Sequence, residues 1–115
     1  MTVLRGLGIA ALLLAAAPAV AGETVTGRWG DDTSCNAVFF SADAPLMVTN
    51  YAVRWQGDSC RVARMYKTGD TVHIQALCWD AAGERSVPVS LRPHGSGKIT
   101  VTWDRARRAD LKRCK

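Results

Sequence analysis

Two histidines and a few carboxylates are the side chains with which this sequence could perform acid–base chemistry. His73 lies within an alternating segment and His94 lies in a Pro-His-Gly-Ser-Gly turn. Nucleophilic catalysis also needs a Ser or Cys beside a base, yet neither G-x-S-x-G nor H-E-x-x-H occurs. Asp31 and Asp32 are adjacent in a predicted loop, where neighbouring side chains point in different directions. We therefore expect no catalytic site, no cofactor and no enzymatic activity.

The four cysteines, Cys35, Cys60, Cys78 and Cys114, have spacings that bear on three kinds of chemistry. Four thiolates can hold zinc, but no two of these cysteines form the C-x-x-C knuckle common in zinc sites. A catalytic thiol has to be unpaired, and an even number of cysteines leaves none over. An even number in a small exported domain is typical of a disulfide framework. We therefore predict two disulfide bonds and no metal site.

A predicted β-hairpin favours one of the three possible cysteine pairings. Residues 60–65 and 71–78 look like strands on either side of a turn that contains Gly69. A hairpin folded about this glycine places Cys60, at the start of one strand, opposite Cys78, at the end of the other. We expect a disulfide between them. The two remaining cysteines then pair with each other and tie the early chain to the C-terminus.

The first residues have the three parts of a secretory signal peptide. Met1–Arg5 carries a positive charge, Gly6–Ala17 is an unbroken apolar run, and Ala19–Ala21 is an A-x-A cleavage site. A transmembrane anchor is the alternative, but the apolar run is shorter than the roughly 20 residues that span a bilayer. We expect a signal peptide over residues 1–21 and a single disulfide-bonded domain over 22–115. The mature chain is then periplasmic or secreted, with no transmembrane segment.

The rest of the chain consists of short alternating segments separated by Gly, Pro, Asn and Asp. None has a helical period over ten or more residues, so we predict an all-β domain. The expected strands, about seven in number, are 24–29, 37–41, 46–56, 60–65, 71–78, 85–92 and 98–104. Short connections favour antiparallel neighbours, which form a small up-and-down barrel or a sandwich; we favour the barrel. Its predicted interior residues are Trp29, Val53, Trp55, Ile74, Val89, Leu91, Ile99 and Trp103. Pro88 cannot donate to a ladder, so its strand is expected to be an edge or bulged there.

The last thirteen residues hold six basic and two acidic side chains. We expect a short basic tail in which Asp104 caps a helical turn running through Leu111. The tail is either a solvated segment or a site for anionic lipid or lipopolysaccharide phosphate. Nucleic acid is not an expected partner, because little of it is present outside the cytoplasm. The basic residues that we single out as candidate contacts are Arg105, Arg107, Arg108 and Lys112.

Arg64 and Trp79 are two further candidate binding residues. In the predicted hairpin Arg64 shares a face with apolar residues, and a buried Arg needs a partner. Either its stem reaches to the barrel rim, or it points into a ligand cavity as an anion-binding group, or the hairpin register slips by one residue. Three of the four tryptophans fall on predicted core faces. Trp79 instead enters a turn, where an exposed Trp is a candidate contact.

Gly27, Arg28 and Trp29 form a G-x-W motif on the first predicted strand. The motif resembles the opening of the lipocalin-like barrels, including exported bacterial metalloprotease inhibitors, and the chain also looks like uncharacterised cysteine-containing secreted proteins of proteobacteria. The resemblance implies that the Trp packs over the closed end of a barrel and that a late Arg, here Arg105 or Arg107, stacks on it. It also implies that the arm before the motif, Gly22–Thr26, enters a protease cleft. The two predicted disulfides and the basic tail depart from the inhibitor pattern.

Size and composition restrict the remaining functions. With 115 residues, the chain has room for one domain, and its formal net charge of +5 is moderate. We expect an exported, non-catalytic binding or inhibitor module that contacts an envelope or secreted protein through loops and rim residues. The alternative is an envelope protein that docks on anionic surface groups through its basic tail.

Overall fold

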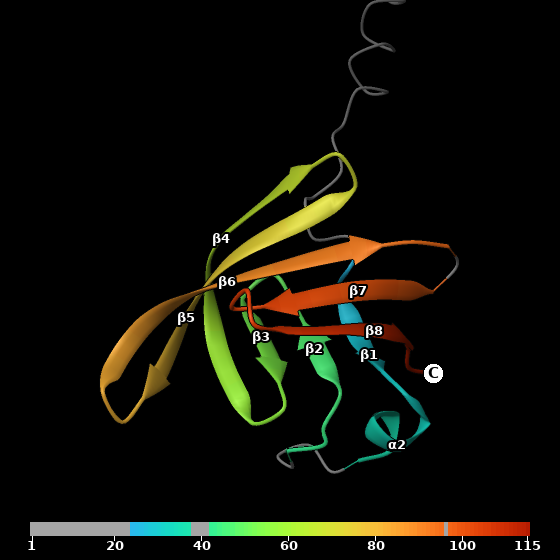
Figure 1. The fold of residues 1–115 in the computed structure, drawn as a ribbon, viewed down its shortest axis with the longest axis horizontal. Coiled ribbons are helices and arrows are strands. Elements are labelled where there is room, and N and C mark those ends of the chain that lie inside the picture. The colour runs from blue at the N-terminus through green and yellow to red at the C-terminus, as the bar shows by residue number, and fades with distance from the viewer. Residues whose placement is uncertain (1–23, 38–41, 96) are drawn as a thin grey trace, which may run out of the picture.

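The computed structural model describes residues 24–37, 42–95 and 97–115, so the predicted signal peptide lies outside the described residues. Eight antiparallel strands follow one another around a closed barrel, in which each strand pairs with its neighbours in sequence and the last strand pairs with the first (Figure 1). The elements are β1 (Gly27–Gly30), α2 (Asp32–Cys35), β2 (Leu46–Val48), β3 (Ala52–Trp55), β4 (Asp58–Thr68), β5 (Thr71–Asp80), β6 (Gly83–Pro93), β7 (Lys98–Trp103) and β8 (Arg107–Arg113). This confirms the predicted all-β barrel.

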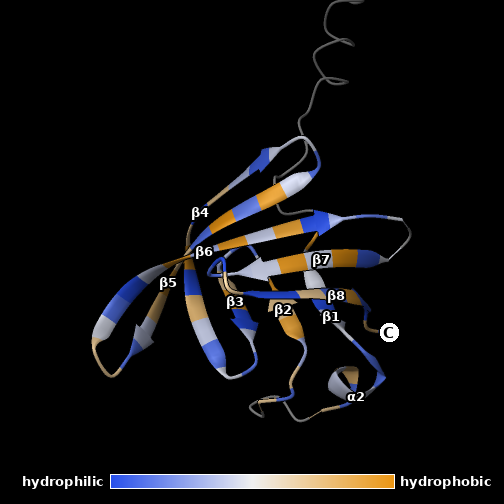
Figure 2. Cartoon of the chain, in the orientation of Figure 1, coloured by the Kyte–Doolittle hydropathy of each residue, from blue (hydrophilic) through white to orange (hydrophobic). Residues whose placement is uncertain are grey.

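Alternate residues of each strand fill the barrel interior. Figure 2 shows the alternation as orange and blue bands along the strands. The eight residues predicted to face inward are all buried, none more than 5% exposed. The other buried apolar residues of the core include Leu46, Val48, Val72, Ala76, Val87 and Val101. Side chains therefore fill the inward positions of the barrel.

Both predicted disulfides are present, Cys60–Cys78 between β4 and β5 and Cys35–Cys114 between α2 and the residue after β8. The register of the β4–β5 hairpin depends on a β-bulge between Val62 and Arg64. Near the turn Thr68 pairs with Thr71. If this register continued without a bulge, Cys60 would lie opposite the residue after Cys78. The extra residue of the bulge corrects this and places the two cysteines directly opposite each other.

The same bulge decides the position of Arg64. The alternation predicted for the hairpin puts Arg64 on the apolar face, but beyond the bulge Met65 takes the inward position and packs against the core. Arg64 is exposed on the outer face. Of the three alternatives for this residue, the one-residue register slip is the one that the structure shows.

Two strand predictions need correction in the middle of the chain. The predicted strand 46–56 is two strands, β2 and β3, because Thr49 turns the chain: its hydroxyl accepts hydrogen bonds from the amides of Tyr51 and Ala52. The predicted strand 37–41 lies largely outside the described residues, and Ala37 itself is not in a strand.

The C-terminal segment is the third correction: it is not a tail with a helical turn but strand β8, which closes the barrel. Asp104 and Arg105 have positive φ angles and form a turn from β7 into β8 rather than a helix cap. Ala109 and Leu111 then pack against the core while charged side chains alternate with them. Inward and outward residues alternate along β8 with period two, but the many charged residues hid this pattern in the sequence.

Strands β5 and β6 extend beyond the barrel as a hairpin, at the lower left of Figure 1. Strand β6 pairs with β5 from Gly83 onward but with β7 only from Val89 onward. Pro88 lies at this boundary, where its carbonyl accepts a hydrogen bond from the Asp104 amide. The prediction that Pro88 marks an edge is therefore confirmed.

Candidate functional site

The projecting β5–β6 hairpin carries the most exposed tryptophan of the described residues. Trp79 is 73% exposed and pairs with Glu84, one step from the turn formed by Ala81 and Ala82. The turn is fixed by the Asp80 carboxylate, which accepts a hydrogen bond from the Ala82 amide at 2.8 Å. We refer to residues 78–85 as the Trp79 hairpin. Its position matches the prediction that Trp79 is accessible for contact.

Covalent and ionic contacts brace the base of the Trp79 hairpin. Cys78, which precedes Trp79, is bonded to Cys60 on β4. Across from it Arg85 donates to Asp104 in the β7–β8 turn at 2.9 Å and lies 3.6 Å from Asp80. The hydrogen bond from Arg85 to the Asp104 carboxylate raises the pKa of this guanidinium. The base of the hairpin is thus held to β4 and to the β7–β8 turn.

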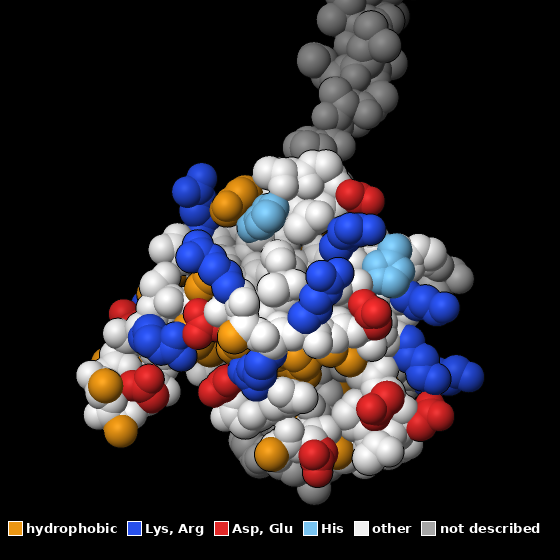
Figure 3. Space-filling model, in the orientation of Figure 1, with side chains coloured by type: hydrophobic (Ala, Val, Ile, Leu, Met, Phe, Trp, Pro, Cys, Tyr) orange, Lys and Arg blue, Asp and Glu red, His pale blue; other side chains and the backbone are white. Residues whose placement is uncertain are grey.

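Arg64 and Arg105 line one groove on the outer face of β4–β7, with a volume of about 680 Å³. The Arg64 guanidinium lies 4.9 Å from the Tyr66 ring centroid, and that ring stacks on His73 at 5.0 Å. Hydroxyl and amide side chains form the floor: Gln75, Ser86, Ser90 and Thr102. Basic side chains are spread over this face in Figure 3. The groove is polar, and the structure brings these two predicted residues to it from distant parts of the chain.

Arg107 makes its contacts at one end of the barrel, where its side chain is partly exposed. Its guanidinium lies 5.0 Å from the Trp55 ring and 5.4 Å from the Trp103 ring, at the end where β3 and β7 finish. It donates to the Asp58 carboxylate at 2.6 Å and to the Gln56 side chain at 2.9 Å. The residue therefore has a structural role at this end of the barrel.

The arginine that stacks on Trp29 is Arg113, so the sequence-based choice of Arg105 or Arg107 is wrong. The Arg113 guanidinium lies 4.2 Å from the Trp29 ring centroid and donates to the backbone carbonyls of Thr24 and Thr26. Trp29 itself donates from Nε1 to the Val25 carbonyl at 2.9 Å. Arg113 is placed there because it pairs directly with Trp29 across β1 and β8.

The same contacts explain the glycine of the G-x-W motif. Gly27 has a φ of +138°, a conformation that L side chains rarely adopt. A Cβ at this position would lie 2.6 Å from Nη1 of Arg113. The described part of the preceding arm, Thr24–Thr26, is held by Arg113, with Val25 fully buried. This arm is accordingly part of the barrel closure.

Arg108 and Lys112 lie on the outer face of β8 and are exposed. Arg108 pairs with Thr102 of β7, and the Lys112 ammonium lies 3.2 Å from the Asp32 carboxylate of α2. With Arg107 turned to the barrel end, the four basic residues singled out near the C-terminus do not form one patch. Arg105 joins Arg64 instead.

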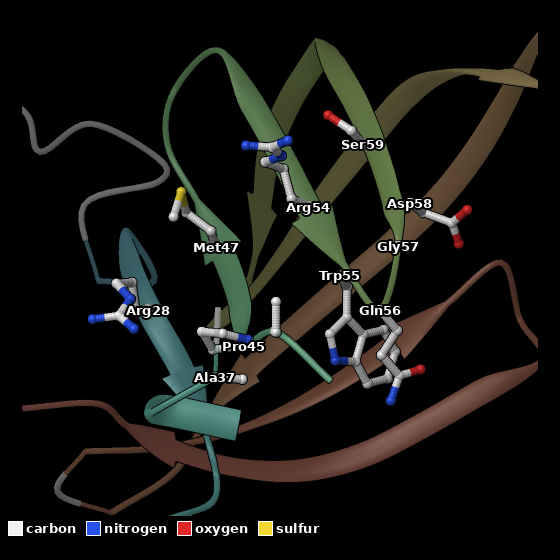
Figure 4. A pocket seen from close by; sticks show the side chains of 11 residues that line it. Arg28, Ala37, Pro45, Met47, Arg54, Trp55, Gln56, Gly57, Asp58 and Ser59 are labelled. Atoms are coloured by element: carbon white, nitrogen blue, oxygen red, sulfur yellow. The ribbon is translucent and has the colours of Figure 1, made fainter. Parts of the chain in front are cut away.

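A second cavity, of about 400 Å³, was not anticipated from the sequence. Three strands contribute one side chain each at the same level: Arg28 from β1 pairs with Met47 from β2, which pairs with Arg54 from β3. Figure 4 shows the Met47 side chain between the two arginines. We refer to this cavity as the Arg28–Arg54 pocket. The sequence analysis missed this cavity because it predicted one strand over 46–56. A single strand places no residue of β2 beside β3.

His73, His94 and Asp31, the residues first considered for acid–base chemistry, each form hydrogen bonds within the described part of the chain. Within it, no group of three or more His, Cys, Asp or Glu side chains is arranged to hold a metal ion. His73 contacts the Thr68 hydroxyl at 2.6 Å, and His94 contacts the Thr100 hydroxyl at 2.8 Å. The Asp31 carboxylate caps α2, and the hydrogen bond from the Ser34 amide lowers its pKa.

The comparisons with known proteins found no relative of this chain. A scan against protein-family models, a search of curated proteins and a search of solved structures each found no match. Among the described residues, no helix combines the length and apolar character required to cross a bilayer. The two disulfides indicate an oxidising compartment, extracellular or periplasmic.

Proposed function

We propose that this protein is a non-catalytic binding module that recognises a partner protein through the Trp79 hairpin. In this proposal residues 1–21 direct export, and the mature domain acts in the periplasm or outside the cell. The observation that carries the proposal is the exposure of Trp79, 73%, on a hairpin that extends past the barrel.

An exposed tryptophan in this position favours a protein partner. Leaving a large aromatic ring in water forfeits the free energy of its burial, and Trp is enriched among the residues that dominate protein interfaces. Charged side chains of both signs surround Trp79, with Arg61 lying 3.7 Å from Glu84 and Arg85 lying between two carboxylates. An apolar anchor within a charged rim is the usual anatomy of a transient interface.

The bracing of the hairpin supports the same function. A loop that is ordered before binding loses less conformational entropy when it docks, so its affinity is higher for the same contacts. The Cys60–Cys78 disulfide and the Arg85 ion pairs order the hairpin in the free protein. The barrel thus acts as a rigid support that presents Trp79.

Site-specific photocrosslinking tests the proposal. A benzophenone side chain is introduced at position 79, and in a matched variant at Tyr51, which is 82% exposed in the β2–β3 turn. Cells that export the full chain are irradiated, and adducts are resolved by mass. We expect a discrete adduct from position 79 that excess wild-type domain competes away, and none from position 51. Equal adducts from both positions, or none from position 79, would contradict the proposal.

A further inference from the structure

We propose that the groove lined by Arg64 and Arg105 binds an acidic saccharide, a short chain of sugar units that carries carboxylates. We refer to it as the Arg64–Arg105 groove. Its volume of about 680 Å³ lies within the range of small-molecule sites. The argument rests on the length of the groove, its charge and its polar floor, and it does not depend on the proposed function.

The two arginines lie at opposite ends of one row of residues across the sheet. Arg64 on β4 pairs with Gln75 on β5, which pairs with Pro88 on β6. The Pro88 carbonyl accepts a hydrogen bond from the amide of Asp104, the residue before Arg105. Because neighbouring strands lie about 4.8 Å apart, this row measures about 14 Å along the sheet. The groove can therefore hold an extended ligand with one anionic group near each arginine.

Positive charge is in excess along this row. Asp104 is the one carboxylate among the described residues that line the groove, and it lies 2.9 Å from the Arg85 guanidinium. Among the ion pairs that the described residues form with one another, none includes Arg64 or Arg105. The Arg64 guanidinium lies over the Tyr66 ring. A guanidinium held in this way keeps its in-plane N–H groups available for the two oxygens of a carboxylate.

The floor between the two arginines consists of uncharged polar side chains: Gln75, Ser86, Ser90 and Thr102. Each of them can both donate and accept hydrogen bonds, as the hydroxyl groups of a sugar do. Ser90 pairs directly with Thr102, so two hydroxyls lie side by side on the floor. Ile74 and Val89 also line the groove, but both are only 2% exposed, so they offer little surface to a lipid chain. The floor therefore matches a sugar ring better than an acyl tail.

The separation of the arginines favours carboxylates over phosphate. A phosphate group carries a charge of about −1.5 to −2 at neutral pH and is best matched where several cations converge on it. Arg64 and Arg105 are instead spread along the groove, with the neutral floor between them. Two singly charged groups on one sugar chain fit this arrangement.

Isothermal titration calorimetry of the purified protein tests the assignment with two acidic probes, trigalacturonate and a hyaluronate tetrasaccharide. We expect at least one of them to bind about tenfold or more tightly than maltotriose, which has sugar rings without carboxylates. The same probe should also bind about tenfold or more tightly than citrate, which has carboxylates without sugar rings. If maltotriose binds as tightly, the arginines do not select the ligand. If citrate binds as tightly, the floor does not recognise the sugar. Either result, or no binding of both acidic probes, overturns the proposal.

Variants of exposed residues locate the binding in the groove. Arg64→Gln and Arg105→Gln should each weaken binding of the acidic probe about tenfold. Arg61→Gln removes the same charge from β4 outside the groove and should leave binding unchanged. Gln75→Glu places a carboxylate on the floor and should abolish binding. Thermal melts of all four variants should show that the fold is retained, because these side chains are exposed. Equal weakening by Arg61→Gln, or undiminished binding in both groove arginine variants, would show that the proposal is wrong.

Discussion

The β1–β8 ladder and the β4–β5 ladder hold neighbouring strands in different ways. Strands β4 and β5 pair along most of their length, with the bulge as the one irregularity in their register. Strands β1 and β8, which close the barrel, pair only through Trp29 with Arg113 and Gly30 with Lys112. The closing ladder is the shorter one, although the barrel depends on it.

Side chains and a covalent bond compensate for the short ladder. Arg113 spans from β8 to the chain before β1, Lys112 pairs with Asp32, and the Cys114 amide donates to the Arg28 carbonyl at 2.9 Å. The Cys35–Cys114 disulfide completes this set. We infer that closure of this barrel is determined by side chains, whereas the long hairpins are determined by backbone pairing.

Removing a disulfide from each ladder should give the largest difference. Loop-closure entropy predicts a loss of about 4.5 kcal/mol for the Cys35–Cys114 bond and about 3 kcal/mol for Cys60–Cys78, because the first closes the longer loop. Urea unfolding of the two double Cys→Ala variants measures both losses. If the variant without Cys60–Cys78 is the less stable, the inference about the two ladders is wrong, because that disulfide lies in the longer ladder.

Arg113→Ala should have the next largest effect and lower the free energy of unfolding by about 2 kcal/mol. The change removes two hydrogen bonds to backbone carbonyls and the stacking on Trp29. Arg113→Lys should recover only part of this, because an ammonium lacks the planar fork. Thermal melting measures the loss, with Arg92→Ala on the exposed face of β6 as the control. If Arg113→Ala were as stable as that control, the inference that side chains determine barrel closure would be wrong.

Arg107→Ala should cost about 1 kcal/mol, and its cost should depend on salt. The ion pair with Asp58 is partly exposed, with 36% and 52% of the two side chains accessible, so it contributes modestly and is screened. Arg113 binds neutral carbonyls, so its contribution should change less between 0.05 and 1 M NaCl (about 14 to 3 Å in screening length). Chemical unfolding at both concentrations tests this contrast. The same salt response in both variants would mean that the two arginines act alike.

Asp31→Ala should have the smallest effect and should depend on pH. The Ser34 amide lowers the pKa of Asp31, so the cap contributes stability above the unfolded pKa of about 3.9 and loses it as pH falls through the folded value. The melting temperature of the variant should therefore be slightly below wild type at pH 7, and the difference should fade in acid. Asp31→Asn should retain most of the cap. A difference that grows in acid would have the wrong sign.

The fold was largely predictable because the core positions are apolar and alternate. The inward set from Trp29 to Trp103 follows from period two. The Cys60–Cys78 pairing was predicted from a turn at Gly69, although the observed register reaches it through the bulge. Strand β8 was missed because its inward residues, Ala109 and Leu111, are few among charges that composition assigns to a tail. The bulge beside Arg64 has no mark in the sequence, since it reflects the register of both strands.

The candidate sites were harder to predict because strand register determines which residues meet. Trp79 was found because exposure at a turn is a local property. The Arg28–Arg54 pocket needs three strands in register, and the position of Arg113 on Trp29 needs the first and last strands to pair. Neither pairing can be read from residues close together in the chain.

The point at which β6 leaves β7 has a consequence for self-association. From Gly83 to Pro88 one side of β6 has no strand beside it in the barrel, and such a margin is where a second molecule could add its own strand. Pro88 has no amide hydrogen to offer there, and Glu84 and Arg85 place charges along the same margin. The molecule thus extends its hairpin into solvent without offering a template for aggregation.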